Sequence, residues 1–136
     1  MIRLRTTLAI FAIVLLGGAA AMADSNSTEA DRITVEELKA KIAKGEKVVI
    51  IDVRGSDYDS SNSKIKGAIR IAPAEIASRL GEIPRDKEVV FYCACSTDGG
   101  SLKARETLLA NGFKKVWALK GGWNAWNQSG GALEPK

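Results

Sequence analysis

The chain has 136 residues, which is the length of one domain, and a formal net charge of +4. Two of the positive charges, Arg3 and Arg5, precede every acidic residue, and the chain beyond them carries only +2, so we predict no nucleic-acid partner. The chain contains no histidine, which removes the Cys–His nucleophile and imidazole metal sites from consideration.

The N-terminal residues have the three-part pattern of a secretory signal peptide. Arg3 and Arg5 are followed by an uncharged apolar run from Leu8 to Ala21, and small residues at Ala21 and Ala23 suit a signal peptidase. The run is shorter than the roughly 20 residues that span a bilayer. We predict a signal peptide at 1–23 and an exported protein, periplasmic or secreted, without stable membrane insertion after processing. An uncleaved anchor is the alternative.

The remaining chain divides into a short polar linker at 24–32, one domain at 33–130 and a C-terminal tail at 131–136. Thr34 and Glu37 have the spacing of a capping box, and Val35, Leu38 and Ile42 recur at helical spacing. The pattern predicts a helix that ends at Gly45.

Further elements alternate between strand and helix patterns. The predicted strands are Val48–Ile51, Gly67–Ile71, Val89–Tyr92 and Val116–Leu119. Between and after them we predict a short helix near Asp57–Ser60, a helix opened by Pro73, a helix at about Ser101–Ala110 and a last helix with Trp123 and Trp126. Leu102, Leu108 and Leu109 lie on the apolar face of the helix at Ser101–Ala110. This alternation predicts an α/β domain with a central, mainly parallel sheet flanked by helices. Ligands bind such sheets at the carboxyl ends of the strands.

Two cysteines, Cys93 and Cys95, follow the strand that ends at Tyr92. The cysteine loop (Cys93–Ser101) leads into a helix, whose first amides are unpaired and carry partial positive charge. A thiol held there is stabilised as the reactive thiolate. The other loop residues predicted to surround a bound persulfide or anionic substrate are Ala94, Ser96, Thr97, Asp98, Gly99, Gly100 and Ser101.

Alternatives remain for these cysteines. They could be small buried side chains that end a core strand. A disulfide between them would close almost no loop, so a purely stabilising bond is a poor explanation. Asp52 and Arg54 follow another strand end, and we predict that they support the site by bonding backbone amides and a carboxylate, respectively.

Motifs in a fixed order resemble those of the rhodanese homology domain, over about Ile33 to Gly130. They are Asp52-Val53-Arg54 after a strand, Asp57-Tyr58, Gly67-Ala68, Tyr92-Cys93, Gly112-Phe113, and Leu119-Lys120-Gly121-Gly122 followed by Trp126. The resemblance implies a three-layer rhodanese-like fold and a thiosulfate sulfurtransferase-like activity. In that activity a cysteine accepts sulfane sulfur from a small donor as a persulfide and passes it to a thiol or other acceptor. It implies no metal, no cofactor and a monomer, with a Gly121-Gly122 turn near the cysteine loop.

Departures from the family bear on the nucleophile and the donor. The family's five-residue spacing, counted back from a helix at Ser101, selects Cys95, whereas the Tyr-Cys pair selects Cys93. The loop has no cation, so Asp98 is expected to repel thiosulfate and to favour neutral or thiol-bearing donors. Lys64 replaces a family histidine and is expected to be solvated. A non-catalytic binding or sensing domain and a Cys-x-Cys thiol–disulfide redox protein are the competing functions.

Overall fold

The computed structural model describes residues 29–136, so the predicted signal peptide lies outside the described residues. The helices and strands in chain order are η1 (Glu29–Asp31), β1 (Arg32–Ile33), α1 (Val35–Ala43), β2 (Val48–Asp52), α2 (Ser56–Ser60), β3 (Ser63–Ile65), β4 (Ile69–Arg70), η2 (Pro73–Ser78), η3 (Leu80–Glu82), β5 (Glu88–Tyr92), α3 (Gly99–Ala110), β6 (Val116–Leu119), α4 (Gly122–Gln128) and β7 (Leu133–Pro135). The three labelled η are short 3₁₀ helices.

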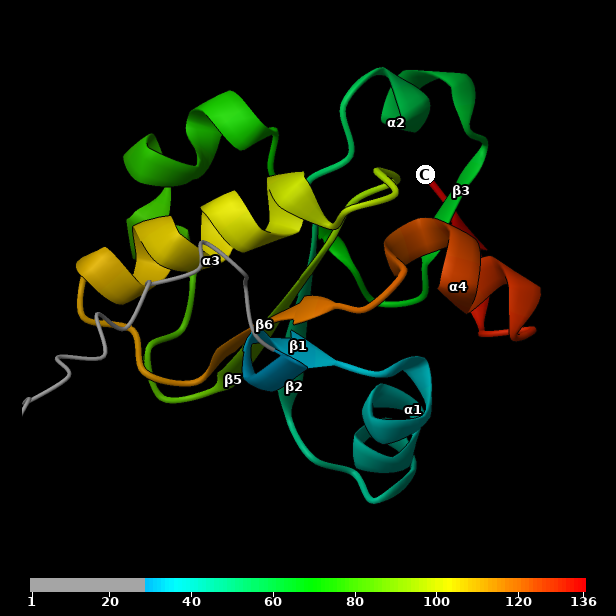
Figure 1. Ribbon diagram of the computed structural model, residues 1–136, viewed down its shortest axis with the longest axis horizontal. Helices are drawn as coiled ribbons and strands as arrows, with labels where there is room; N and C mark the ends of the chain where they lie inside the picture. Colours follow the sequence, from blue (N-terminus) through cyan, green and yellow to red (C-terminus); the bar gives the residue numbers. More distant parts are fainter. Residues whose placement is uncertain (1–28) are drawn as a thin grey trace, which may run out of the picture.

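A five-stranded parallel sheet in the order β1-β6-β5-β2-β4 forms the centre, with α3 and η2 on one face and α1 and α4 on the other (Figure 1). Alternate side chains of the central strands face opposite layers. Ile51 and Phe91 are buried with α3 and η2, whereas Ile50 and Val90 are buried with α1 and Trp126 of α4. The predicted three-layer α/β class with a mainly parallel sheet is therefore confirmed.

The start of α1 is the predicted capping box. The Glu37 amide donates to Thr34 Oγ1 at 3.1 Å, and the Thr34 amide donates to Glu37 Oε2 at 2.8 Å. Each bond satisfies an amide that the first helical turn leaves unpaired. This cap begins α1 directly after β1, so the helix returns along the face of the sheet.

The buried face of α3 differs from the prediction. Leu109 is 36% exposed and Leu102 is only partly buried, whereas Ser101, Ala104 and Leu108 are buried. These three residues lie at helical spacing, and the small side chains of Ser101 and Ala104 allow the helix to pack close to the sheet. The apolar residues at 102 and 109 therefore do not mark the core-facing side.

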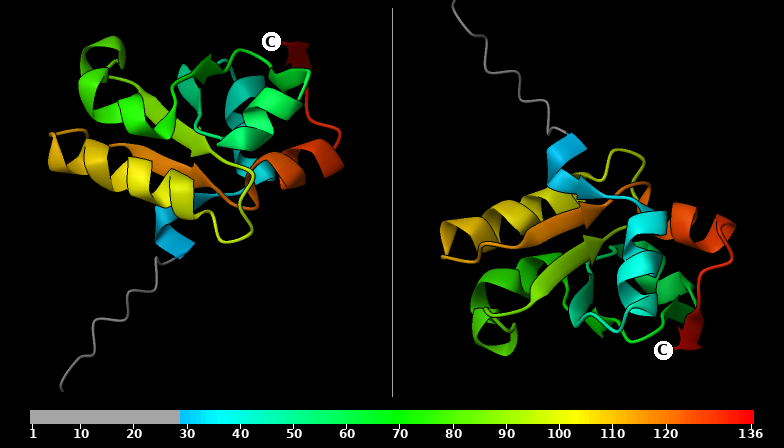
Figure 2. Two further views of the ribbon diagram at one scale, coloured as in Figure 1. Left: turned by 90° about the horizontal axis from the view of Figure 1, so that it is seen from above. Right: turned by 90° about the horizontal axis from the view of Figure 1, so that it is seen from below.

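Three strands lie where the sequence pattern predicts none. β1 spans the predicted boundary, with Arg32 in the stretch assigned to the linker and Ile33 in the domain, and it pairs with β6 at the edge of the main sheet. β3 and β7 form a separate antiparallel pair, which joins the end of the chain to the segment after α2. Both views in Figure 2 place β7 beside that segment. None of the helices in residues 29–136 combines the length and apolar character needed to cross a bilayer.

Candidate functional site

The cysteine loop lies at the carboxyl edge of the parallel sheet, between β5 and α3. Helix α3 begins at Gly99, two residues before the predicted start. Asp98 adopts a left-handed conformation with φ of 57°, and the Leu102 amide donates to its carbonyl oxygen at 2.9 Å, which closes the first turn early. Five residues therefore separate Cys93 from the observed start of the helix, although the residue there is Gly99 and the serine of the family's pattern is Ser101.

Both sulfur atoms lie against the first turn of α3. A Cβ placed on Gly100 would be 3.7 Å from Cys93 Sγ and 3.9 Å from Cys95 Sγ. Unpaired amides and the helix dipole make this position favourable for a negatively charged sulfur. Cys93 is 4% exposed and belongs to the core, whereas Cys95 is partly buried. The two residues are joined by a disulfide bond, with their Cα atoms 5.6 Å apart.

The charge of Asp98 is offset by a cation from another part of the chain. Arg32 Nε of β1 lies 3.1 Å from Asp98 Oδ2, and the pair is largely buried. The same oxygen accepts from the Gly121 amide at 3.3 Å. The loop itself carries no cation, and the compensating charge comes from outside it, because the parallel pairing of β1 with β6 brings Arg32 to this edge of the sheet.

The start of α4 supports the cysteine loop from the side. The Trp123 amide donates to the Cys93 carbonyl oxygen at 2.9 Å. Gly122 has a φ of +50°, and a Cβ there would overlap the same carbonyl oxygen. The glycine pair thus lets two backbone segments approach more closely than a side chain would permit. Figure 2 shows the orange start of α4 beside the yellow-green segment ahead of α3.

Replacing Gly122 with alanine is expected to destabilise the domain by about 1–3 kcal/mol, because the new methyl group would force α4 away from Cys93. Urea unfolding followed by circular dichroism measures the change. Gly81→Ala is the matched control, since a Cβ at Gly81 meets no atom within 4 Å. Equal unfolding midpoints for the two variants would contradict the predicted close contact.

A buried ion pair lies beneath this edge of the sheet. Asp52 and Arg54 are both 0% exposed, and Arg54 Nη2 lies 2.7 Å from Asp52 Oδ2. The Tyr92 hydroxyl donates to the same oxygen at 2.7 Å and accepts from the Ile65 amide at 3.2 Å. Burial and then the hydrogen bond to Asp52 raise the pKa of Tyr92 far above its ordinary value. Tyr92 therefore stays neutral and acts as a fixed hydrogen-bond donor.

The ion pair also contacts the segment that holds Cys93. The Arg54 guanidinium carbon lies 4.1 Å from the centre of the Trp123 ring, which stacks on Tyr92 at 6.2 Å. Within residues 29–136, Arg54 Nη1 has no hydrogen-bond partner, so its main contact on that side is aromatic. The pair thus supports the ring of the residue whose amide binds the Cys93 carbonyl.

The other predicted loop residues divide by exposure. Ser96, Thr97 and Gly99 face solvent, and Ala94 is partly buried. Ser101 is fully buried in the first turn of α3, and its hydroxyl has no partner among the residues that the structure describes. One side of the loop is therefore exposed to solvent, and the other side is buried against the core.

The expectation that Lys64 is solvated is wrong. Its ammonium donates to the Ala68 carbonyl at 2.6 Å and lies 3.2 Å from the Glu134 carboxylate. The hydrogen bond from the Gly67 amide, and then that from Lys64, lowers the pKa of Glu134. The ion pair with Glu134 stabilises the pairing of β3 with β7, so Lys64 has a structural role there.

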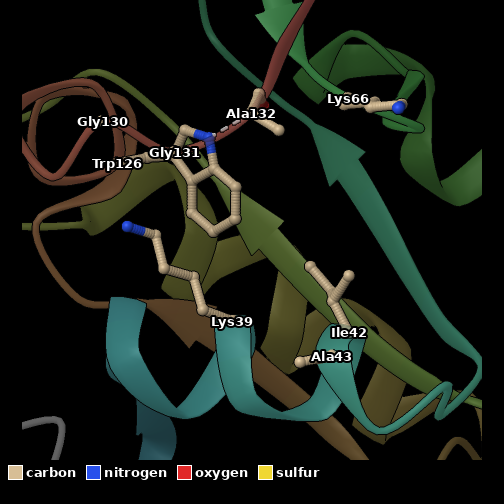
Figure 3. A pocket seen from close by; sticks show the side chains of 8 residues that line it. All are labelled: Lys39, Ile42, Ala43, Lys66, Trp126, Gly130, Gly131 and Ala132. Atoms are coloured by element: carbon tan, nitrogen blue, oxygen red, sulfur yellow. Dashed lines mark hydrogen bonds between the residues drawn. The ribbon is translucent and has the colours of Figure 1, made fainter.

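A separate apolar hollow of about 590 Å³ lies between α1 and the end of α4 (Figure 3). Its walls include Lys39, Ile42 and Trp126, whose ring nitrogen donates to the Ala132 carbonyl at 3.1 Å. None of its lining residues comes from the cysteine loop. The hollow is thus distinct from the edge of the sheet that carries the two cysteines.

Comparison with known proteins agrees with this geometry. The model of the rhodanese-like domain family matches residues 34–129. A sulfurtransferase of Allochromatium vinosum is 31% identical over 74% of this chain and 91% of its own length, and a thiosulfate sulfurtransferase of Shewanella oneidensis is 28% identical over 71% and 92%. The solved rhodanese-like domain of an Anabaena protein superposes with a TM-score of 0.67 at 28% identity, covering 78% of this chain and 80% of that one. The chain belongs to the rhodanese-like family.

Proposed function

We propose that this chain is a sulfurtransferase that carries a sulfane sulfur on Cys93 as a persulfide. The observation that carries the proposal is the position of Cys93 Sγ at the end of β5, against the first turn of α3. The helix amides and dipole stabilise a thiolate and then the terminal sulfur of a persulfide. The relatives named as sulfurtransferases support the same reaction class.

The reaction needs two displacements at sulfur. With thiosulfate, the Cys93 thiolate attacks the outer sulfur, a new sulfur–sulfur bond forms, and sulfite leaves with the electron pair of the broken bond. An acceptor such as cyanide or a thiolate then attacks the terminal sulfur of the persulfide. The Cys93 thiolate is the leaving group of this second step, so no histidine base, metal or organic cofactor is required.

Loading of a variant with a single thiol tests the proposal. Cys95→Ser, reduced and freed of reductant, is incubated with thiosulfate or with glutathione persulfide, and its intact mass is measured. We expect a gain of one sulfur atom that cyanide removes, and no gain in the matched Cys93→Ser variant. No sulfur on either variant from either donor would refute the sulfurtransferase, whereas sulfur on Cys93→Ser alone would place the carrier at Cys95.

The buried ion pair of Arg32 and Asp98 is expected to affect the KM for a negatively charged sulfur donor. Arg32→Gln leaves the Asp98 carboxylate uncompensated, so we expect the KM for thiosulfate to rise by about tenfold, with a smaller change at high salt. The KM for glutathione persulfide, which donates from its protonated form with a neutral terminal sulfur, should change less. Lys114→Gln removes an exposed cation far from the loop and serves as the control. An equal effect of both variants would contradict a local role of Arg32.

A thiol–disulfide redox protein is the second candidate, and the observation that favours it is the bond between Cys93 and Cys95. Equilibration against glutathione buffers of graded composition measures how readily the bond is reduced. Reduction of the disulfide within this range of buffers, together with no sulfur loading of either Cys→Ser variant, would favour the redox function over sulfur transfer.

A further inference from the structure

The disulfide joins two sulfur atoms that occupy one small site. One residue separates Cys93 from Cys95, and both Sγ atoms lie within 3.9 Å of where a Cβ on Gly100, in the first turn of α3, would be. The Cα separation of 5.6 Å lies within the ordinary range for a disulfide. The loop therefore needs no large rearrangement to bring one sulfur to the other.

This bond contributes little to holding the fold. It closes a ring across a single intervening residue, so it restricts the unfolded chain very little. The loop is already held by two other contacts, the Trp123 amide on the Cys93 carbonyl and the Arg32–Asp98 ion pair. The pairing of the two cysteines therefore calls for a chemical explanation in place of a structural one.

The two cysteines also differ in access. Cys93 is 4% exposed and packed into the core, whereas Cys95 is partly buried and is followed by the exposed Ser96 and Thr97. A bulky thiol acceptor can reach Cys95 more readily than Cys93. The terminal sulfur of a persulfide on Cys93 has its nearest thiol within the same loop.

We propose that Cys95 is a resolving cysteine, which attacks the Cys93 persulfide and releases its terminal sulfur as hydrogen sulfide. The proposal rests on the proposed persulfide on Cys93. It adds a product, sulfide, and a second thiol reaction to the activity of the site. It also explains the observed disulfide as the state that the domain reaches after one release.

The step balances without an outside oxidant. The Cys95 thiol loses its proton to solvent, and its thiolate attacks Cys93 Sγ. The Cys93–Cys95 bond forms while the bond from Cys93 to the terminal sulfur breaks, and the electron pair leaves with hydrosulfide, which takes up a proton. Cys95 is oxidised and the terminal sulfur is reduced. Because both groups lie in one loop, this attack has the advantage of an intramolecular reaction.

Regeneration requires a dithiol reductant. One thiolate of the dithiol attacks the more accessible Cys95 sulfur, and its second thiolate resolves the mixed disulfide, which frees both cysteines and oxidises the dithiol. With thiosulfate as donor, one cycle converts thiosulfate and the dithiol into sulfite, hydrogen sulfide and the oxidised dithiol. The site thus couples sulfur transfer to dithiol oxidation.

The test compares the wild-type chain with Cys95→Ser, both reduced and then freed of reductant. Each protein receives whichever of thiosulfate or glutathione persulfide loads Cys95→Ser. Released sulfide, free thiols and intact mass are then measured. We expect the wild-type chain to release one sulfide per molecule and to lose both thiols, and Cys95→Ser to retain its sulfur until dithiothreitol is added. Glu106→Gln, an exposed change on α3, should behave as the wild type does.

The outcomes separate this inference from the proposed function. A wild-type chain that keeps the added sulfur, with the Cys95 thiol still free, overturns the resolving role and leaves the sulfurtransferase standing. Failure of both Cys95→Ser and Cys93→Ser to load refutes the sulfurtransferase itself. If Cys93→Ser is the variant that holds the sulfur, the roles given to the two cysteines are wrong.

Discussion

Replacing Cys93 with serine is expected to lower the rate of cyanide-dependent sulfur transfer by at least about a thousandfold. A serine hydroxyl stays protonated where the cysteine is a thiolate, and it cannot form a persulfide. Thiocyanate formation with excess donor and cyanide measures the rate. Since Cys93 is 4% exposed, the serine hydroxyl is buried in the core at a cost of about 1–3 kcal/mol, so the unfolding midpoint is measured as well and the rates are compared where both proteins are folded.

Cys95→Ser is the matched comparison, because it removes a thiol from the same loop. We expect its rate to stay within about tenfold of the wild-type rate when dithiothreitol is present. Cyanide attacks the Cys93 persulfide directly, so thiocyanate formation does not require Cys95. A thousandfold loss in Cys95→Ser, with Cys93→Ser active, would place the nucleophile at position 95. That result would favour the spacing counted from Ser101.

The central sheet was predictable because its strands carry strong local patterns. The β-branched run of β2 and the apolar run of β5 are typical of parallel strands buried on both faces. The two-residue β1 has no such pattern, and it becomes a strand only because β6 offers it an edge. β7 likewise depends on β3, more than sixty residues earlier in the chain. Short strands that depend on distant partners leave no periodicity to detect.

The site was predictable in its chain position but not in its electrostatics. Tyr92-Cys93 and the Gly121-Gly122 turn could be identified because their motifs are contiguous. The partner of Asp98 could not, since Arg32 precedes it by 66 residues and no local feature links them. The early start of α3 was missed because glycine has low helix propensity, whereas here Gly99 and Gly100 form the first turn beside the sulfur atoms.

Replacing Asp52 with asparagine is expected to destabilise the domain by about 3–5 kcal/mol, because the Arg54 guanidinium would remain fully buried without its countercharge. The amide keeps the shape of the carboxylate, so the change tests charge and not packing. Urea unfolding measures the free energy. Glu82→Gln is the control for an exposed ion pair, that with Arg79, and should leave the unfolding midpoint unchanged.

The double variant Asp52→Asn, Arg54→Met decides whether the cost comes from the unpaired charge. Replacing a buried ion pair by uncharged groups of similar volume is often close to neutral, so the double variant should recover most of the stability lost in Asp52→Asn. Arg54 also lies against the ring of Trp123, whose amide binds the Cys93 carbonyl. If the double variant is stable but does not transfer sulfur, Arg54 has a positioning role at Cys93. If the double variant is as unstable as Asp52→Asn, the predicted cost of burying the unpaired Arg54 guanidinium is wrong.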